Sequence, residues 1–279
     1  PLYMAYSLYA MKLPGPEDKL PLEQTQALWQ ETVEQQIFVL CKTRMAESIT
    51  RRTLVGYQDW TVNTTYIPHL LERMENDPQR LAKKLQRTDT WGKEGQPMKF
   101  DAIVGNPPYQ EMDGGNNASA VPLYQLFMEQ AILVEPHYIS MIMPARWYSG
   151  GRGLDKFRSE MLNDERLCKM MDFSDSNDCF PGVDIAGGVC YFLWDKSAHG
   201  ECKVISVHNG KQSISERKLN EYDTFIRFKE AISIIKKIQL RESKFYSERV
   251  SSQKPFGLRT YVKPTESGDI KLRYSGGIG

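Results

Sequence analysis

Histidine is scarce in this 279-residue sequence, which contains only 4. The 5 cysteines are an odd number, and no two of them stand in a Cys-x-x-Cys arrangement. Because zinc sites usually cluster these residue types, we expect no metal centre and free thiols of the kind found in the cytoplasm. No run of about 18 apolar residues occurs, which argues against a membrane span. The first residues also lack the basic start of a signal peptide, so we predict a cytoplasmic protein.

Net charge is also small, at +1, but it is unevenly distributed along the chain. The segment from Glu216 to Gly279 has 14 Lys/Arg against 8 Asp/Glu, a net charge of +6, which leaves about −5 for residues 1–215. A basic C-terminal part suits a phosphate-binding surface, although a solvated helix face would give the same composition. At 41% hydrophobic residues, the chain can bury one large core and a smaller appendage.

Apolar runs alternate with helical patterns over residues 37–173. We expect strands at 37–41, 100–105, 138–143 and 167–173, followed by two successive strands at 188–194 and 203–207. We expect helices at 2–11 (buried), 21–36, 44–54, 67–85 (interrupted near Pro78), 123–134, 154–162 and 224–240. This order predicts an α/β fold with a mostly parallel sheet, and the closing strand pair indicates an antiparallel edge. Residues 113–119 have the composition of a flexible loop.

The most informative stretch is residues 100–109, Phe-Asp-Ala-Ile-Val-Gly-Asn-Pro-Pro-Tyr. A strand cannot continue through Pro107 and Pro108, because proline fixes φ and has no N–H to donate. The residue before a proline is held extended, so Asn106 should project its amide from the strand tip. The carboxyl end of a strand is where α/β proteins usually bind ligands.

Two hydrogen-bond acceptors, the Asn106 side-chain oxygen and the Pro107 carbonyl, are held close together by this stiff backbone. Such a pair suits an NH₂ group that donates both hydrogens, which frees the nitrogen lone pair to act as a nucleophile. Tyr109 offers a flat face on which a planar ring can stack. The pattern favours methylation of an amino group on a base or amide, although a turn that merely ends a strand remains open.

The run from Phe100 to Tyr109 resembles the catalytic motif of amino-group methyltransferases that use S-adenosylmethionine, chiefly DNA adenine-N6 methyltransferases. In order along the chain, further segments resemble the restriction–modification type of that family. The resemblance implies a Rossmann-like methyltransferase sheet in which Asn106, Pro107, Pro108 and Tyr109 are catalytic. It also implies that Asp89 and Asn106 contact the cofactor, and that Phe180 and Tyr109 hold an extruded adenine. A surface aspartate and a core phenylalanine are the structural alternatives for Asp89 and Phe180.

The resemblance covers about residues 37–240. It implies a catalytic core at 1–215, and a helical connector with the start of a target-recognition domain at 216–279. Double-stranded DNA is the implied partner. In this type of enzyme a nuclease or specificity module can share the same parent chain.

Two features depart from the family pattern. No strand followed by Gly-x-Gly and a helix precedes the motif, and the earliest glycine, Gly15, stands between two prolines. Cys41 follows the strand at 37–41 where the family has an acidic residue for the ribose hydroxyls. Both ends look cut, so we expect the glycine loop upstream of Pro1 and weak or no cofactor binding by this chain alone. The alternatives are a protein glutamine methyltransferase, which shares the motif, and a non-catalytic DNA-binding fragment.

Overall fold

The computed structural model describes residues 1–15, 20–110, 121–149 and 153–240. The chain forms two compact units, Pro1–Arg227 and Phe228–Gly279, which we describe separately. The predicted loop at 113–119 and the predicted target-recognition segment from residue 251 onward lie outside the described residues. The assignment of a catalytic core to 1–215 and a connector to 216–279 stays a prediction.

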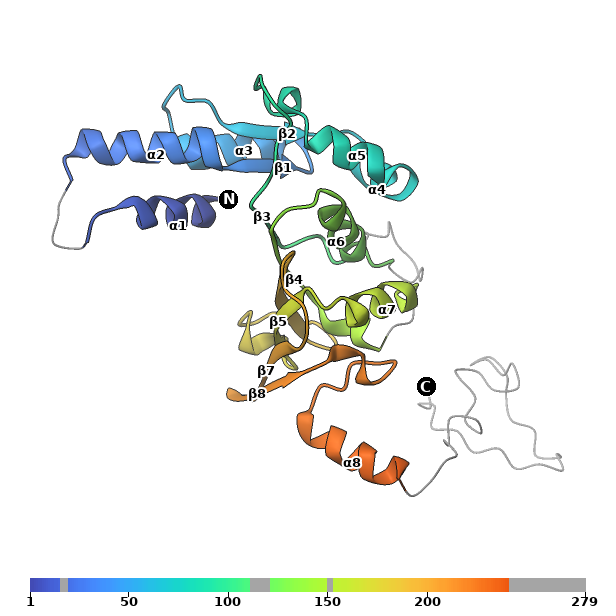
Figure 1. Ribbon diagram of the computed structural model, residues 1–279. Helices are drawn as coiled ribbons and strands as arrows, with labels where there is room; N and C mark the ends of the chain where they lie inside the picture. Colours follow the sequence, from blue (N-terminus) through green and yellow to red (C-terminus); the bar gives the residue numbers. More distant parts are fainter. Residues whose placement is uncertain (16–19, 111–120, 150–152, 241–279) are drawn as a thin grey trace, which may run out of the picture. The chain divides into compact units, whose positions relative to one another are not determined.

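A six-stranded sheet forms the centre of the first unit (Figure 1). Its order is β3-β4-β6-β5-β7-β8. The strands are β3 (Ala102–Gly105), β4 (Tyr138–Pro144), β5 (Leu167–Phe173), β6 (Val189–Asp195), β7 (Cys202–His208) and β8 (Lys211–Arg217). β3 is parallel to β4 and β5 to β7, whereas β6 and β8 are antiparallel to their neighbours. The predicted α/β sheet, mostly parallel with an antiparallel edge, is confirmed.

The strands of the antiparallel part are arranged differently from the prediction. β6 and β7 do not pair with each other, because β6 inserts between β4 and β5. The edge strand is β8, which the sequence analysis missed because its residues are mostly polar. β8 pairs with β7 through the two-residue turn Asn209-Gly210, where both residues have positive φ.

A second, two-stranded parallel sheet pairs β1 (Phe38–Cys41) with β2 (Asn63–Tyr66). β2 was also missed, because its sequence is polar although rich in β-branched threonine. The fully buried Asn63 side chain fixes this strand by donating to the carbonyls of Glu34 and Ile37, each at 2.9 Å. β2 is therefore anchored by a polar side chain, and no apolar sequence pattern marks it as a strand.

The helices lie close to their predicted positions. They are α1 (Leu2–Lys12), α2 (Leu22–Gln36), α3 (Arg44–Val55), α4 (Leu70–Asn76), α5 (Pro78–Leu85), α6 (Tyr124–Leu133), α7 (Asp155–Asn163) and α8 (Lys229–Gln239). The expected break near Pro78 is a full separation, since Asp77 ends α4 and caps α5. The prediction that the first helix is buried is wrong, because Ala5 is its only buried residue and Tyr3 is 85% exposed.

The helix predicted at 224–240 begins only at Lys229. Residues 224–228 are not helical because Phe225 packs into the core of the first unit. Its ring lies 4.6 Å from that of Tyr148, and its N–H donates to the Tyr148 carbonyl at 3.2 Å. The chain is thus held against the first unit until Arg227, where that unit ends.

Candidate active site

The tip of β3 has the geometry predicted for it. Gly105, the last residue of β3, pairs with Met141 of β4, and Asn106 follows it directly. Asn106 is exposed and Pro107 is buried, so the proline fixes the backbone while the amide faces outward. No described residue hydrogen-bonds to the Asn106 amide, which leaves its oxygen available as an acceptor.

A cavity of about 890 Å³ opens at this tip. Asn106, Pro107, Pro108, Tyr109 and Phe180 all line it, so the structure brings together residues predicted from two distant segments. The cavity residues come from the carboxyl ends of β3, β4 and β5, which run in one direction. This is the edge of an α/β sheet at which ligands are expected.

Two aromatic rings flank the cavity opening. Tyr109 is half-buried, and burial, together with the nearby Cys179 and Cys190 thiols, raises the pKa of its hydroxyl. Phe180 is also half-buried and packs in part against Phe173 and other core residues of β5, β6 and β7. Phe180 is therefore both a packing residue and a cavity residue, which combines the two alternatives given by its sequence position.

Phe180 belongs to a loop formed by residues 176–188, called here the cavity loop. Its first residue, Ser176, is 1% exposed and holds the loop from inside. The Ser176 hydroxyl donates to the Val183 carbonyl at 2.6 Å and accepts from the Ile185 N–H at 2.8 Å. The Ser176 carbonyl accepts from the Phe180 N–H at 2.7 Å. These bonds fold the loop back over the cavity.

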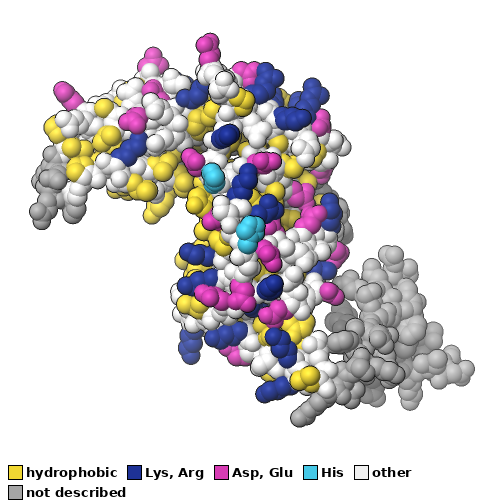
Figure 2. Space-filling view, in the orientation of Figure 1, with side chains coloured by type: hydrophobic (Ala, Val, Ile, Leu, Met, Phe, Trp, Pro, Cys, Tyr) yellow, Lys and Arg dark blue, Asp and Glu magenta, His cyan; other side chains and the backbone are white. Residues whose placement is uncertain are grey.

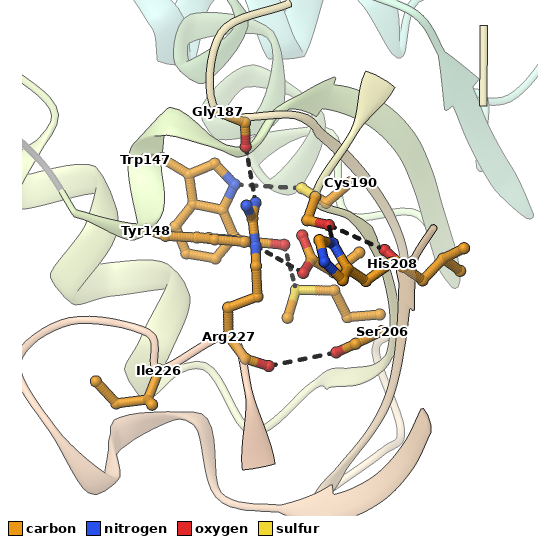
Figure 3. Close-up of polar contacts among 12 residues, drawn as sticks. Trp147, Tyr148, Gly187, Cys190, Ser206, His208, Ile226 and Arg227 are labelled. Carbon is orange, nitrogen blue, oxygen red and sulfur yellow. Dashed lines mark hydrogen bonds and ion pairs between the residues drawn. The ribbon is translucent and has the colours of Figure 1, made fainter. Parts of the chain in front are cut away.

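Two arginines hold the other end of the cavity loop. Arg146, just after β4, donates from Nε to the Ala186 carbonyl at 3.0 Å. Arg227 donates from Nη2 to the next carbonyl, that of Gly187, at 2.8 Å (Figure 3). The Nε of Arg227 also lies 2.8 Å from a carboxylate oxygen of Asp172, a residue of β5 with no exposed surface. The sequence analysis missed these contacts. The feature that could have indicated them is an aspartate, Asp172, inside a mostly apolar strand.

Asp89 lies apart from this group. It lines a second cavity of about 930 Å³, together with residues of α4 and α5. The Asp89 carboxylate forms an ion pair with Arg87, and the hydrogen bond from Arg87 lowers the pKa of that carboxyl. Figure 2 shows Lys and Arg side chains gathered over α5 at the upper right, and the basic residues lining this cavity are Arg73, Arg80, Lys83, Lys84 and Arg87. The role of Asp89 in cofactor binding stays a prediction.

The first cavity has features that fit the cofactor implied by the sequence resemblance. Tyr124, the first residue of α6, is 2% exposed, and its hydroxyl makes no hydrogen bond with any described residue. Since a buried polar group normally has a partner, this hydroxyl is a free contact for a polar ligand group. The volume is also in the range of small-molecule and cofactor sites. These features therefore suit a small-molecule ligand or cofactor that carries a polar group.

The described part of the chain contains no cluster of three or more His, Cys, Asp or Glu side chains placed to hold a metal ion. None of its helices is long and apolar enough to cross a lipid bilayer. All five cysteines are free, and three of them, Cys41, Cys190 and Cys202, are buried.

Comparison with known proteins places this geometry in context. Residues 35–180, just over half of the chain, match the family described as Eco57I restriction-modification methylase. An uncharacterized adenine-specific methylase of Mycoplasma pneumoniae is 35% identical over 134 residues, which are 46% of this chain and 31% of that protein. The chain thus spans about a third of that relative's length.

Solved structures with a similar fold include a modification subunit of a putative type I restriction enzyme from Vibrio vulnificus YJ016. It is 16% identical with a TM-score of 0.43, and the likeness covers 84% of this chain and 45% of that one. A structure from a type I restriction–modification assembly is 13% identical with a TM-score of 0.46, covering 90% of this chain and 48% of that one.

Proposed function

The chain belongs to the Eco57I restriction-modification methylase family, and we propose that it contributes the catalytic tip and base pocket of a site-specific DNA adenine-N6 methyltransferase. The observation that carries the proposal is the exposed Asn106 amide beside Pro107, which has no hydrogen-bond partner among the described residues and lies at a cavity that Tyr109 and Phe180 also line. S-adenosylmethionine supplies the methyl group when it is bound. Double-stranded DNA is the proposed substrate, in agreement with the predicted cytoplasmic location.

The residues at the tip of β3 prepare the amino group for reaction. The side-chain oxygen of Asn106 and the carbonyl of Pro107 each accept one hydrogen of the adenine N6 amino group. When both N–H bonds point at acceptors, the nitrogen lone pair is turned out of the ring plane and becomes nucleophilic. Proline at 107 and 108 keeps these acceptors in place, because φ is fixed at both positions.

The aromatic residues of the cavity bind the base. An adenine inside a duplex cannot reach the β3 tip, so it must leave the stack, at a cost of a few kcal/mol. Stacking on Tyr109, with Phe180 against the ring, offsets this by about 1–3 kcal/mol per base on the scale of single-strand binding. The half-buried state of both rings leaves a face available for such contact.

The proposal is tested in the full-length protein with the substitution Asn106→Ala. Purified protein is incubated with radiolabelled S-adenosylmethionine and unmethylated double-stranded bacterial DNA, and N6-methyladenine is measured by mass spectrometry. We expect Asn106→Ala to abolish methylation and to leave DNA affinity unchanged, because the variant removes only an acceptor. The control is Asn163→Ala, which changes an exposed amide at the end of α7 and should retain activity.

Three results would contradict the proposal. Full activity of Asn106→Ala would show that the Asn106 amide takes no part in the reaction. Label appearing on a glutamine side chain of an added protein, with none on DNA, would instead support a protein glutamine methyltransferase. A wild-type protein that retains DNA but transfers no methyl group would favour the non-catalytic alternative.

A further inference from the structure

We propose that Arg227 is a positioning residue that fixes the cavity loop, and with it Phe180, against the catalytic tip. The inference rests on the proposed function, since the loop matters only if the cavity holds a base. Arg227 is not a cavity residue itself and touches neither Asn106 nor Tyr109 among the described contacts. It acts through the backbone of Gly187, in the loop that lines the cavity.

The anchor of Arg227 lies on a strand that is paired on both sides. Asp172 is fully buried on β5, where it pairs in register with Cys190 of β6 and Ser206 of β7. The Arg227 side chain is 20% exposed, and its guanidinium carbon lies 5.2 Å from the centre of the Tyr148 ring. Arg227 thus contacts both the Asp172 carboxylate and the face of the Tyr148 ring, and Figure 3 shows the Arg227 and Tyr148 side chains next to each other.

The other end of the guanidinium reaches the loop. Its Nη2 donates to the Gly187 carbonyl at 2.8 Å, while Nε lies 2.8 Å from a carboxylate oxygen of Asp172 as an ion pair. Only a planar guanidinium can satisfy two partners in different directions from one fixed position. The pair Asp172–Arg227 therefore transfers the fixed geometry of β5 to the end of the cavity loop.

The cavity loop depends on such contacts because strand pairing does not hold it. Ladder pairing on β5 ends at Phe173 and resumes on β6 at Val189, so residues 176–188 lie outside the sheet. Beyond the Ser176 contacts, the end of the loop is held by the two arginine bonds to Ala186 and Gly187 and by the Ala145 N–H, which donates to the Gly188 carbonyl at 3.0 Å. Arg146 is an exposed side chain without a buried anchor, whereas Arg227 has one. Arg227 is accordingly the stronger of the two supports.

The ion pair is also better explained by positioning than by stability. A buried ion pair is costly to desolvate and often adds nothing over a well-packed apolar pair. Here it places a charged donor beneath a loop carbonyl, which an apolar pair could not do. The backbone of Arg227 is fixed as well, because its carbonyl accepts from the Ser206 hydroxyl at 3.3 Å. The residue with which the first unit ends therefore also supports its cavity.

The test uses the full-length protein with Arg227→Lys. Lysine keeps a positive charge for Asp172 but is a compact point charge that cannot also reach Gly187. The matched control is Arg217→Lys, since Arg217 is likewise a largely buried arginine but donates to the Ile226 carbonyl and not to the cavity loop. Hydrogen exchange at the amides of Val183, Ile185 and Gly188 reports loop order, and methyl transfer to unmethylated bacterial DNA reports function.

We expect faster exchange at these three amides in Arg227→Lys, with no such change in Arg217→Lys. We expect kcat/KM for DNA to fall by about 10- to 100-fold, the factor for loss of one hydrogen bond from a charged donor. The KM for S-adenosylmethionine should stay unchanged. Unaltered exchange together with unaltered kcat/KM would overturn the inference, as would equal effects of the two lysine variants.

A second variant and a measurement that does not depend on activity cover the cases in which the first variant or the methylation assay fails. If Arg227→Lys fails to fold, the double variant Asp172→Asn with Arg227→Gln removes the buried charges together, and it should show the same faster exchange. If wild-type protein transfers no methyl group to DNA, the proposed function fails, and the exchange measurement still decides whether Arg227 orders the loop.

Discussion

Gly188 is the position where a single methyl group should do the most damage to the site. It ends the cavity loop with φ at +79°, and a Cβ built there would lie 2.0 Å from the Phe173 carbonyl oxygen. The left-handed backbone costs a non-glycine residue about 1–2 kcal/mol. Phe173 cannot move aside, because it is paired with both Val189 and Val207, and forcing such a contact costs about 1–3 kcal/mol. Gly188→Ala should therefore destabilise the first unit by about 2–5 kcal/mol.

A glycine in the same loop provides the control. Gly182 has nearly the same φ, +80°, but a Cβ there would meet nothing within 4 Å. Gly182→Ala should lower the free energy of unfolding by only about 1–2 kcal/mol, the cost of the left-handed backbone. Urea unfolding followed by tryptophan fluorescence measures both, since Trp147 and Trp194 are fully buried in the core of this unit. Equal loss of unfolding free energy in the two variants would refute the steric argument.

Two further predictions concern ionisable side chains. Burial would raise the pKa of Asp164, but hydrogen bonds from Arg166 and Trp194 lower it overall, so the ionised carboxylate stabilises the fold above an unfolded pKa of about 3.9. That contribution is lost as the pH falls through the lower folded pKa, and Asp164→Asn should flatten the acid limb of a Tm-against-pH curve; an unchanged slope would contradict this. Burial raises the pKa of the Cys190 and Cys202 thiols to about 12. Iodoacetamide at mild alkaline pH should therefore leave both unmodified until urea is added, as read by mass spectrometry, and their labelling in native protein would be the opposing result.

The position and exposure of the β3 tip could be predicted because its geometry is local. Pro107 and Pro108 determine where the strand stops and how Asn106 is presented, whatever the rest of the chain does. The apolar runs that became β4 and β5 were equally clear, since burial on both faces requires continuous hydrophobic sequence. Family membership then agrees with the resemblance carried by the same residues.

The missed strands have polar sequences for different reasons. β8 is a half-exposed edge strand, so apolar periodicity is weak there. Its signal was the Asn209-Gly210 pair, which adopts positive φ at both positions and closes a two-residue hairpin. β2 has no such turn signal, and its buried anchor is an asparagine whose partners lie in an earlier segment. That contact is tertiary, and local pattern cannot reveal it.

The same limit applies to the supports of the cavity loop. Asp172 is a charged residue in a mostly apolar strand, but its partner Arg227 follows three further strands along the chain. The sequence predicts residues that line the cavity, because their chemistry is specific. It does not predict the residues that hold them, because any charged pair of suitable reach would serve.

The site therefore has two parts that differ in rigidity. The acceptors of Asn106 and Pro107 stand on a strand end fixed by pairing and by proline, and in the proposed function they contact the reacting amino group. Phe180 stands on a loop fixed by side-chain hydrogen bonds, each of which can be lost without breaking the sheet. A base that leaves a duplex can enter the cavity more easily if the cavity loop can move, whereas the acceptors that contact its amino group must stay fixed. Substitutions in the loop supports should thus act mainly on capture of the base, and substitutions at the β3 tip mainly on transfer itself.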